Sequence, residues 1–256
     1  MNGKWTVIPD IEDIDRFLKL EEQYNTAFEY NDFCSPSVYE DKDETQRRIR
    51  FYKSLGRTNP DDTLHGVFYD IAMISTDSVI RNRSRQLMEM SIETAKRLSC
   101  KGVVFHTGRI AGLDTKEYND SWIKGMTEYL ADLGYRHRDI KIYMENTFEA
   151  TPDPINGFMA GLKGTDNVKI CFDYAHAALT KTPLTEWYEA FSSDIAHIHV
   201  NDNDLKIDLH QPPGEGKIDF GLFKQLIEQH DYKESILLEV TGYEKTLRSL
   251  EYITKL

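Results

Sequence analysis

The sequence lacks any long hydrophobic run. Its uninterrupted apolar stretches are only a handful of residues long, whereas a helix needs about 20 such residues to cross a bilayer. The opening MNGKWTVIPD has no basic segment followed by an apolar core, which is the pattern of a secretory signal. We therefore expect neither a membrane span nor a signal peptide.

Cysteine is scarce. The three cysteines, Cys34, Cys100 and Cys171, are widely spaced and form no CxxC pair. Secreted domains that depend on disulfides carry many cysteines at close spacing, whereas free thiols are typical of a reducing compartment. The pattern predicts free cysteines and a cytoplasmic protein.

The chain also lacks a linker. Its 256 residues contain no stretch rich in proline, serine or glycine and no sustained block of charge. A single α/β barrel commonly reaches this length, so we expect one domain over residues 1–256. The net charge of the chain is −12, which still leaves room for a local basic groove. That charge disfavours a surface that broadly coats nucleic acid.

Short apolar runs alternate with segments of helical period. Eight strands are expected near Trp5–Ile8, Thr26–Tyr30, Thr63–Phe68, Gly102–His106, Lys141–Glu145, Val168–Asp173, Ile195–Val200 and Ser235–Val240. Helices are expected at Ile11–Tyr24, Asp43–Leu55, Asp77–Leu98, Thr115–Leu133, Pro154–Leu162, Pro183–Phe191, Phe220–Gln229 and in a last segment to about Leu256. Eight such alternations predict an α/β protein, a single (β/α)8 TIM barrel.

Polar residues of one kind follow the predicted strands. In IAHIHV, His197 and His199 share one face because side chains alternate along a strand; we expect His197 to be a hydrogen-bonded core residue. Nine histidines and acids stand at or just beyond strand ends: His65, His106, Glu145, Asp173, His176, His199, Asp208, His210 and Glu239. A barrel of this kind places its chemistry at these ends. Imidazole and carboxylate together predict a divalent metal, with Mn, Co, Zn and Mg all compatible.

Several motifs carry a family resemblance. They are EN at Glu145–Asn146, DxxH at Asp173–His176, HxND at His199–Asp202, DxH at Asp208–His210, GEG at Gly214–Gly216 and LE at Leu238–Glu239. From about Thr63 onward the chain resembles the xylose-isomerase-like TIM-barrel superfamily. That superfamily includes sugar and sugar-phosphate isomerases and epimerases, and also the endonuclease IV class of DNA-repair enzymes.

The two branches imply different ligand sets and different numbers of ions, from one to three. In the isomerase and epimerase branch, one divalent cation is bound through the positions of Glu145, Asp173, His199 and Glu239. In the endonuclease branch, all nine positions hold three zinc ions. The resemblance implies Glu145 and Glu239 as the acid and base of a proton transfer through a metal-stabilised enediolate, or the nine ligands as the centre of an abasic-site phosphodiesterase.

Departures from the endonuclease pattern favour the sugar branch. The first predicted strand has no histidine, Glu29 stands where sugar-acting relatives place a substrate-facing glutamate, and Thr107–Gly108 replaces a Pro-Gly pair. Our leading expectation is a metal-dependent isomerase or epimerase of a sugar or sugar phosphate, and the alternative is a zinc-dependent abasic-site endonuclease. Nucleic acid is a partner only under the alternative.

Further residues are candidate substrate contacts. His106 and His176 could bind substrate hydroxyls, and Arg81, Arg85 and Arg109 are candidates for a substrate phosphate because guanidinium pairs well with phosphate. A membrane partner is not expected, and a homo-oligomer is compatible with the sequence.

Overall fold

The computed structural model describes residues 3–162 and 164–256. Its eight strands are short and mostly buried, as expected for parallel strands that are covered on both faces. They are β1 (Lys4–Val7), β2 (Ala27–Tyr30), β3 (Thr63–His65), β4 (Gly102–His106), β5 (Lys141–Glu145), β6 (Val168–Asp173), β7 (Ile195–Val200) and β8 (Ser235–Leu238).

The strands follow one another in chain order and close into a barrel. The closing pair, β1 with β8, is parallel and brings Thr6 beside Leu237. A helix follows each of the eight described strands, as a parallel connection requires. The predicted (β/α)8 barrel is therefore confirmed.

Ten helices are described within the ranges given above. They are α1 (Ile14–Tyr24), α2 (Pro36–Glu40), α3 (Lys42–Ser54), α4 (Ser78–Arg97), α5 (Lys116–Arg136), α6 (Asp153–Met159), α7 (Tyr174–Ala178), α8 (Leu184–Phe191), α9 (Phe220–Gln229) and α10 (Tyr243–Ile253). In this described part of the chain, no helix combines the length and the apolar character needed to cross a membrane.

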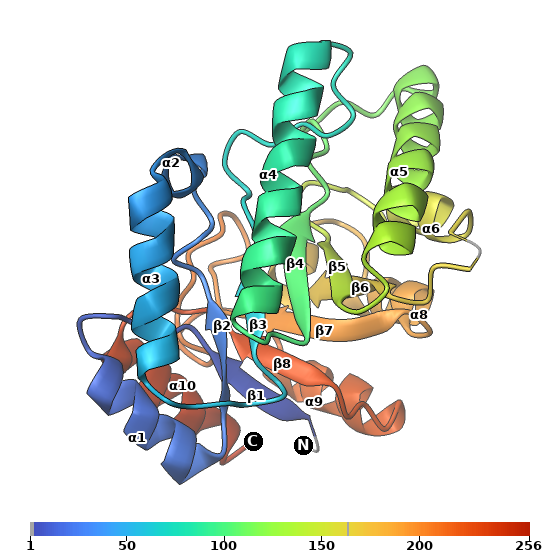
Figure 1. Cartoon of the computed structure of the whole chain (residues 1–256). Helices are drawn as coiled ribbons and strands as arrows, with labels where there is room; N and C mark the ends of the chain where they lie inside the picture. Colours follow the sequence, from blue (N-terminus) through green and yellow to red (C-terminus); the bar gives the residue numbers. More distant parts are fainter. Residues whose placement is uncertain (1–2, 163) are drawn as a thin grey trace. The chain divides into compact units, whose positions relative to one another are not determined.

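The chain forms two compact parts. The terminal part consists of the residues up to Glu29 together with Ile170–Leu256, and the central part is Tyr30–Lys169. In the terminal part β7 pairs with β6 and β8, and β1 pairs with β8 and β2. In the central part β4 pairs with β3 and β5, and α4 packs on β3 and β4 (Figure 1). The single domain expected from the sequence stays a prediction.

Aromatic side chains fill much of the terminal part's core. Phe172 on β6 is fully buried and makes edge contacts with Tyr174, Tyr188 and Phe191, at centroid distances of 6.1, 5.9 and 6.0 Å. Edge-to-face contacts of this kind are the favoured arrangement of aromatic pairs. These contacts hold β6 in place, and Asp173 is the last residue of this strand.

Some predicted boundaries were wrong by a few residues. β3 ends at His65 rather than Phe68, because after Gly66 the backbone leaves β4 and the N–H of Phe68 donates to the carbonyl of Cys34. β8 ends at Leu238 rather than Val240, because the chain turns there. Pro183 precedes α8 instead of beginning it. The short helices α2 and α7 were not predicted, since single-turn helices have almost no periodicity.

The start of α4 offers a direct test of local stability. The Asp77 carboxylate accepts hydrogen bonds from the N–H groups of Val79 (2.7 Å) and Ile80 (3.3 Å). Replacing Asp77 with alanine should lower the free energy of unfolding by about 1 kcal/mol, measured by chemical denaturation. Asp77→Asn is the matched control, because asparagine caps a helix about as well as aspartate does. Equal loss in both variants would contradict the capping role.

Candidate metal centre

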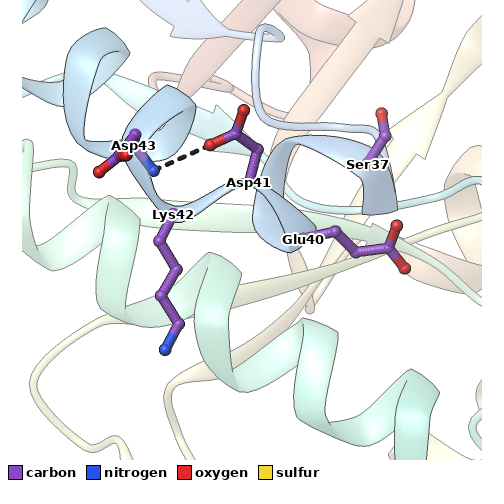
Figure 2. Close-up of a pocket in the computed structure, with 5 residues that line it drawn as sticks. All are labelled: Ser37, Glu40, Asp41, Lys42 and Asp43. Atoms are coloured by element: carbon purple, nitrogen blue, oxygen red, sulfur yellow. Dashed lines mark hydrogen bonds between the residues drawn. The ribbon is translucent and has the colours of Figure 1, made fainter.

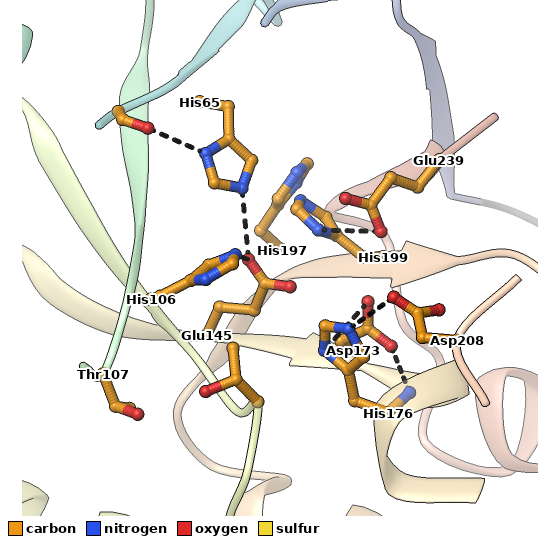
Figure 3. Close-up of polar contacts among 12 residues, drawn as sticks. His65, His106, Thr107, Glu145, Asp173, His176, His197, His199, Asp208 and Glu239 are labelled. Carbon is orange, nitrogen blue, oxygen red and sulfur yellow. Dashed lines mark hydrogen bonds and ion pairs between the residues drawn. The ribbon is translucent and has the colours of Figure 1, made fainter. Parts of the chain in front are cut away.

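Three predicted ligands come together at the strand ends of the central part. His106 and Glu145 are register partners on β4 and β5, and His65 ends β3. The Glu145 Oε2 atom lies 3.3 Å from His65 Nε2 and 3.5 Å from His106 Nε2 (Figure 3). Glu145 and His65 are almost fully buried. We call these three residues the central trio.

Neighbouring groups orient the two imidazoles of the central trio. His65 Nδ1 lies 3.0 Å from the carbonyl oxygen of Gly66, which can only accept, so Nδ1 carries the proton and Nε2 is left to face Glu145. The Phe68 ring stacks on His106 at 4.8 Å and touches His65 edge-on. Sequence reasoning missed Phe68; the available signal was an aromatic residue three positions after a strand-end histidine.

Six predicted ligands form a continuous series in the terminal part. Successive side chains approach one another at 3.5, 3.3, 2.7, 3.8 and 3.6 Å, in the order Asp173, His176, Asp208, His210, Glu239 and His199. They come from β6, α7, the β7–α9 loop, the end of β8 and β7. We call this series the six-residue belt. All its facing atoms are imidazole nitrogens or carboxylate oxygens, the donors that divalent transition metals prefer.

Three partly exposed members of the six-residue belt could hold an ion by themselves. The ligand atoms of His176, Asp208 and His210 all lie within 4.8 Å of one another. Burial acts to raise the pKa of Asp208, but hydrogen bonds from His176 and His210 outweigh it and lower this pKa. Burial likewise acts to lower the pKa of His210, and the contacts with Asp208 and Glu239 reverse that and raise it to about 9. We call these three residues the outer trio.

Asp173 makes two contacts with His176 that fix its carboxylate. Its Oδ1 atom accepts the N–H of His176 at 2.6 Å and caps α7, while Oδ2 faces His176 Nδ1. The helix cap thus places a ligand-type histidine three residues after a ligand-type aspartate. A DxxH motif follows from this geometry, because the residue whose N–H is capped belongs to the first turn.

Glu29 is buried and contacts His199, a member of the belt. It is fully buried, with Oε2 2.9 Å from His197 Nε2 and Oε1 3.3 Å from His199 Nε2. His197 Nδ1 lies 2.6 Å from the Ser235 hydroxyl. Burial acts to raise the pKa of Glu29, but His199 and His197 outweigh it and lower this pKa well below its usual value. Glu29 is thus placed to orient His199, a common arrangement behind metal-binding histidines, and its role as a substrate contact stays a prediction. His197 is buried and hydrogen-bonded, as expected for a core residue.

The three arginines predicted to bind phosphate donate to groups within the chain. Arg81 donates to the carbonyl of Ser75 (2.6 Å) and Arg85 to that of Met73 (3.0 Å), both in the β3–α4 connection. The buried Arg109 donates to Asp114 (2.9 Å) and to Asn119. These contacts hold the connections after β3 and β4, and the phosphate role stays a prediction.

Thr107 and Gly108, the departure from the endonuclease pattern, also have structural partners. The Thr107 hydroxyl donates to Glu149, whose other oxygen accepts the N–H of Thr147 at 2.8 Å. Burial raises the pKa of Glu149. Gly108 has a φ of +63°, and a Cβ there would lie 3.1 Å from the Ile71 carbonyl. Thr107 therefore joins the connections that follow β4 and β5, and Gly108 packs against the connection that follows β3.

A hollow elsewhere in the central part contains none of these ligands. It lies where α2 meets α3 and is lined by Ser37, Glu40, Asp41, Lys42 and Asp43 (Figure 2). The Asp41 carboxylate in it accepts the N–H groups of Asp43 and Glu44, both at 3.0 Å. That carboxylate is a helix cap, so we assign the hollow no chemistry.

The known proteins that are similar to this chain include a probable endonuclease and an epimerase-like protein. The chain is 24% identical over 230 residues to a probable endonuclease 4 of Thermoplasma volcanium, an overlap that covers 82% of this chain and 79% of that protein. The solved structure of the TTHB071 protein from Thermus thermophilus, soaked with ZnCl2, is 22% identical with a TM-score of 0.78 and covers 100% of this chain and 98% of that one. A D-tagatose 3-epimerase-like protein is also 22% identical with a TM-score of 0.78, covering 98% and 96%.

One family model matches most of the chain. Residues 26–256 match the family described as xylose isomerase-like TIM barrel. The matched region includes every strand from β2 to β8, and therefore the central trio and the six-residue belt. This chain belongs to the xylose isomerase-like TIM barrel family.

Proposed function

We propose that this protein is a metal-dependent hydrolase of phosphoesters whose centre holds more than one divalent ion. The observation that carries the proposal is the six-residue belt. A zinc ion takes about four ligands, so six adjoining imidazole and carboxylate side chains exceed what a single ion needs. The central trio adds three more donors of the same kind. Nine donors suit two or three ions.

The fold suits ligands at strand ends. In such barrels the carboxyl ends of all strands face one rim, where the active site lies. We propose that Asp173, His199 and Glu239 hold one ion, that the outer trio holds a second, and that the central trio binds a further one. The donor set suits zinc, with manganese and cobalt as alternatives.

The bound ions would supply a hydroxide at neutral pH and would stabilise the developing charge on the leaving oxygen. The chain's own residues hold and aim the ligands. Asp208 bridges His176 and His210, Gly66 sets the tautomer of His65, and Glu29 orients His199. The substrate class that fits is a phosphodiester, with an abasic-site duplex as the first candidate because a probable endonuclease 4 is among the relatives.

A sugar isomerase or epimerase is the second candidate. It would use Glu145, Asp173, His199 and Glu239 around one ion, with the two glutamates moving a proton next to a carbonyl. The net charge of −12 and the fold likeness to an epimerase-like protein favour it. We rank it second because Glu29, which would face the sugar, is buried against His197 and His199. The cytoplasmic location and self-association expected from the sequence stay predictions.

Metal counting and two activity assays separate these candidates. We expect elemental analysis of the purified protein to find two or three zinc-type ions per chain, and a chelator to abolish nicking of an abasic duplex. One ion per chain, no nicking and deuterium incorporation into a sugar in deuterated water would replace the hydrolase with the isomerase. Absence of both activities in a fully loaded protein would reject both candidates.

A further inference from the structure

The segment Asn201–Asn203 follows β7 directly and contacts three ligand-bearing segments of the terminal part. Asn201 Nδ2 lies 3.4 Å from Glu239 Oε2. Asn203 Nδ2 donates to the carbonyl of Ala175, the residue before His176, at 3.3 Å. Asp202 lies between them. We propose that Asp202 is a positioning residue that arranges the outer trio before any metal binds.

Asp202 accepts hydrogen bonds from backbone groups near both ends of the β7–α9 loop. It is fully buried, and its carboxylate accepts four backbone N–H groups, from Asn203 (2.9 Å), Gly214 (2.9 Å), Gly216 (2.8 Å) and Ile218 (3.0 Å). Hydrogen bonds to an ionised acceptor are roughly twice as strong as neutral ones. One carboxylate therefore joins the beginning of the loop to its end.

The backbone of Asp202 fixes the position of His210 as well. Asp202 N–H donates to the Gln211 carbonyl at 2.7 Å, and Gln211 N–H donates back to the Asp202 carbonyl at 2.9 Å. His210, the neighbour of Gln211, has a φ of +46°, which is uncommon for a residue other than glycine. Its Nδ1 donates to the carbonyl of Glu239 at 3.0 Å. Such a conformation persists only when its surroundings determine it.

Gly216 shows how closely the loop fits this carboxylate. A Cβ at Gly216 would lie 2.3 Å from Asp202 Oδ1 and 2.4 Å from the Asn203 carbonyl. Any side chain there would push the loop away from Asp202. The second glycine of the GEG motif is therefore a packing requirement of Asp202, and Asp202 in turn holds the loop that carries Asp208 and His210.

Asp202→Asn tests the proposal with zinc as the probe. The amide keeps the size of the side chain but turns one acceptor oxygen into a donor that faces backbone N–H groups. We expect the variant to bind one zinc ion fewer, or to bind that ion 10- to 100-fold more weakly, as for other residues that support metal ligands. In the metal-free protein, hydrogen exchange of the amides of residues 204–218 should become faster.

Two further variants make the test decisive. Asp219→Asn changes a carboxylate in the same loop that caps α9 through the N–H of Leu222 (2.9 Å), and it should keep the wild-type zinc count. Gly216→Ala should reproduce the Asp202→Asn pattern, and it decides the matter if Asp202→Asn does not fold. Wild-type zinc binding and exchange in the folded variant would overturn the proposal.

The inference rests on the metal centre of the proposed function, not on the reaction. A protein that cleaves no phosphoester but loses one zinc ion in Asp202→Asn would reject the hydrolase and keep the positioning role. Conversely, a protein that cleaves phosphoesters with an unchanged zinc count in Asp202→Asn would keep the hydrolase and reject the positioning role.

Discussion

Asp208→Asn should lower phosphodiester cleavage on the order of 10³-fold. Asp208 Oδ2 contacts both His176 Nε2 (3.3 Å) and His210 Nε2 (2.7 Å), so its loss removes the one carboxylate of the outer trio. An ion that stabilises transition-state charge contributes several kcal/mol, and about 1.4 kcal/mol corresponds to a factor of ten in rate. Initial rates on an abasic duplex, with metal content measured in parallel, give the comparison.

Glu189→Gln is the matched control for this variant. Glu189 also pairs with an imidazole, His230 Nε2 at 3.0 Å, but on the surface and away from every predicted ligand. Its rate and metal content should equal those of the wild type. If Asp208→Asn retains full phosphodiesterase activity with one ion fewer, the outer trio takes no part in the reaction. An isomerase would tolerate Asp208→Asn far better, so the variant also distinguishes the two candidate functions.

Glu29→Ala should destabilise the metal-free protein by about 3–5 kcal/mol, because removing one partner of a buried ionic contact leaves the other uncompensated. Both carboxylate oxygens of Glu29 contact imidazoles, and all three side chains are fully buried. Zinc affinity should also fall 10- to 100-fold as His199 loses its orientation. Urea unfolding of the metal-free protein and zinc competition with a chelator measure the two effects separately.

Ser235→Ala should lower the stability less than Glu29→Ala does. The Ser235 hydroxyl lies 2.6 Å from His197 Nδ1. His197 in turn contacts Glu29, and Glu29 contacts His199. A single neutral hydrogen bond contributes about 1 kcal/mol, so stability should fall by that amount while zinc affinity stays near the wild-type value. Wild-type stability and zinc affinity in Glu29→Ala would show that His199 is oriented by other groups.

Strand ends account for most of what could be predicted about the site. Parallel strands deliver their last residues to one rim, so a histidine or acid at a strand end can be assigned to the site without coordinates. His106, Glu145 and Asp173 are each the last residue of their strand, and Glu239 follows β8 by one. Asp208 and His210 were found from their motif alone, because they lie in a loop without periodicity.

Residues that support the ligands could not be predicted in the same way. Glu29 and His197 are 168 positions apart in the chain, and no local pattern indicates that they touch. Arg81, Arg85 and Arg109 show the same limit: only the structure reveals that nearby carbonyls and carboxylates accept their hydrogen bonds, and their phosphate role stays a prediction.

The alternation of short apolar strands with amphipathic helices, the polar residues near the strand ends and the short DxxH and DxH motifs are local properties. They sufficed to predict the barrel and to nominate its nine candidate ligands. Which ligands adjoin, which nitrogen of an imidazole is available, and which buried carboxylate holds a loop depend on contacts between distant segments. Those contacts exist only once the strands have paired, and for that reason the belt, the Glu29 contacts and the hydrogen bonds of Asp202 were decided by the tertiary structure.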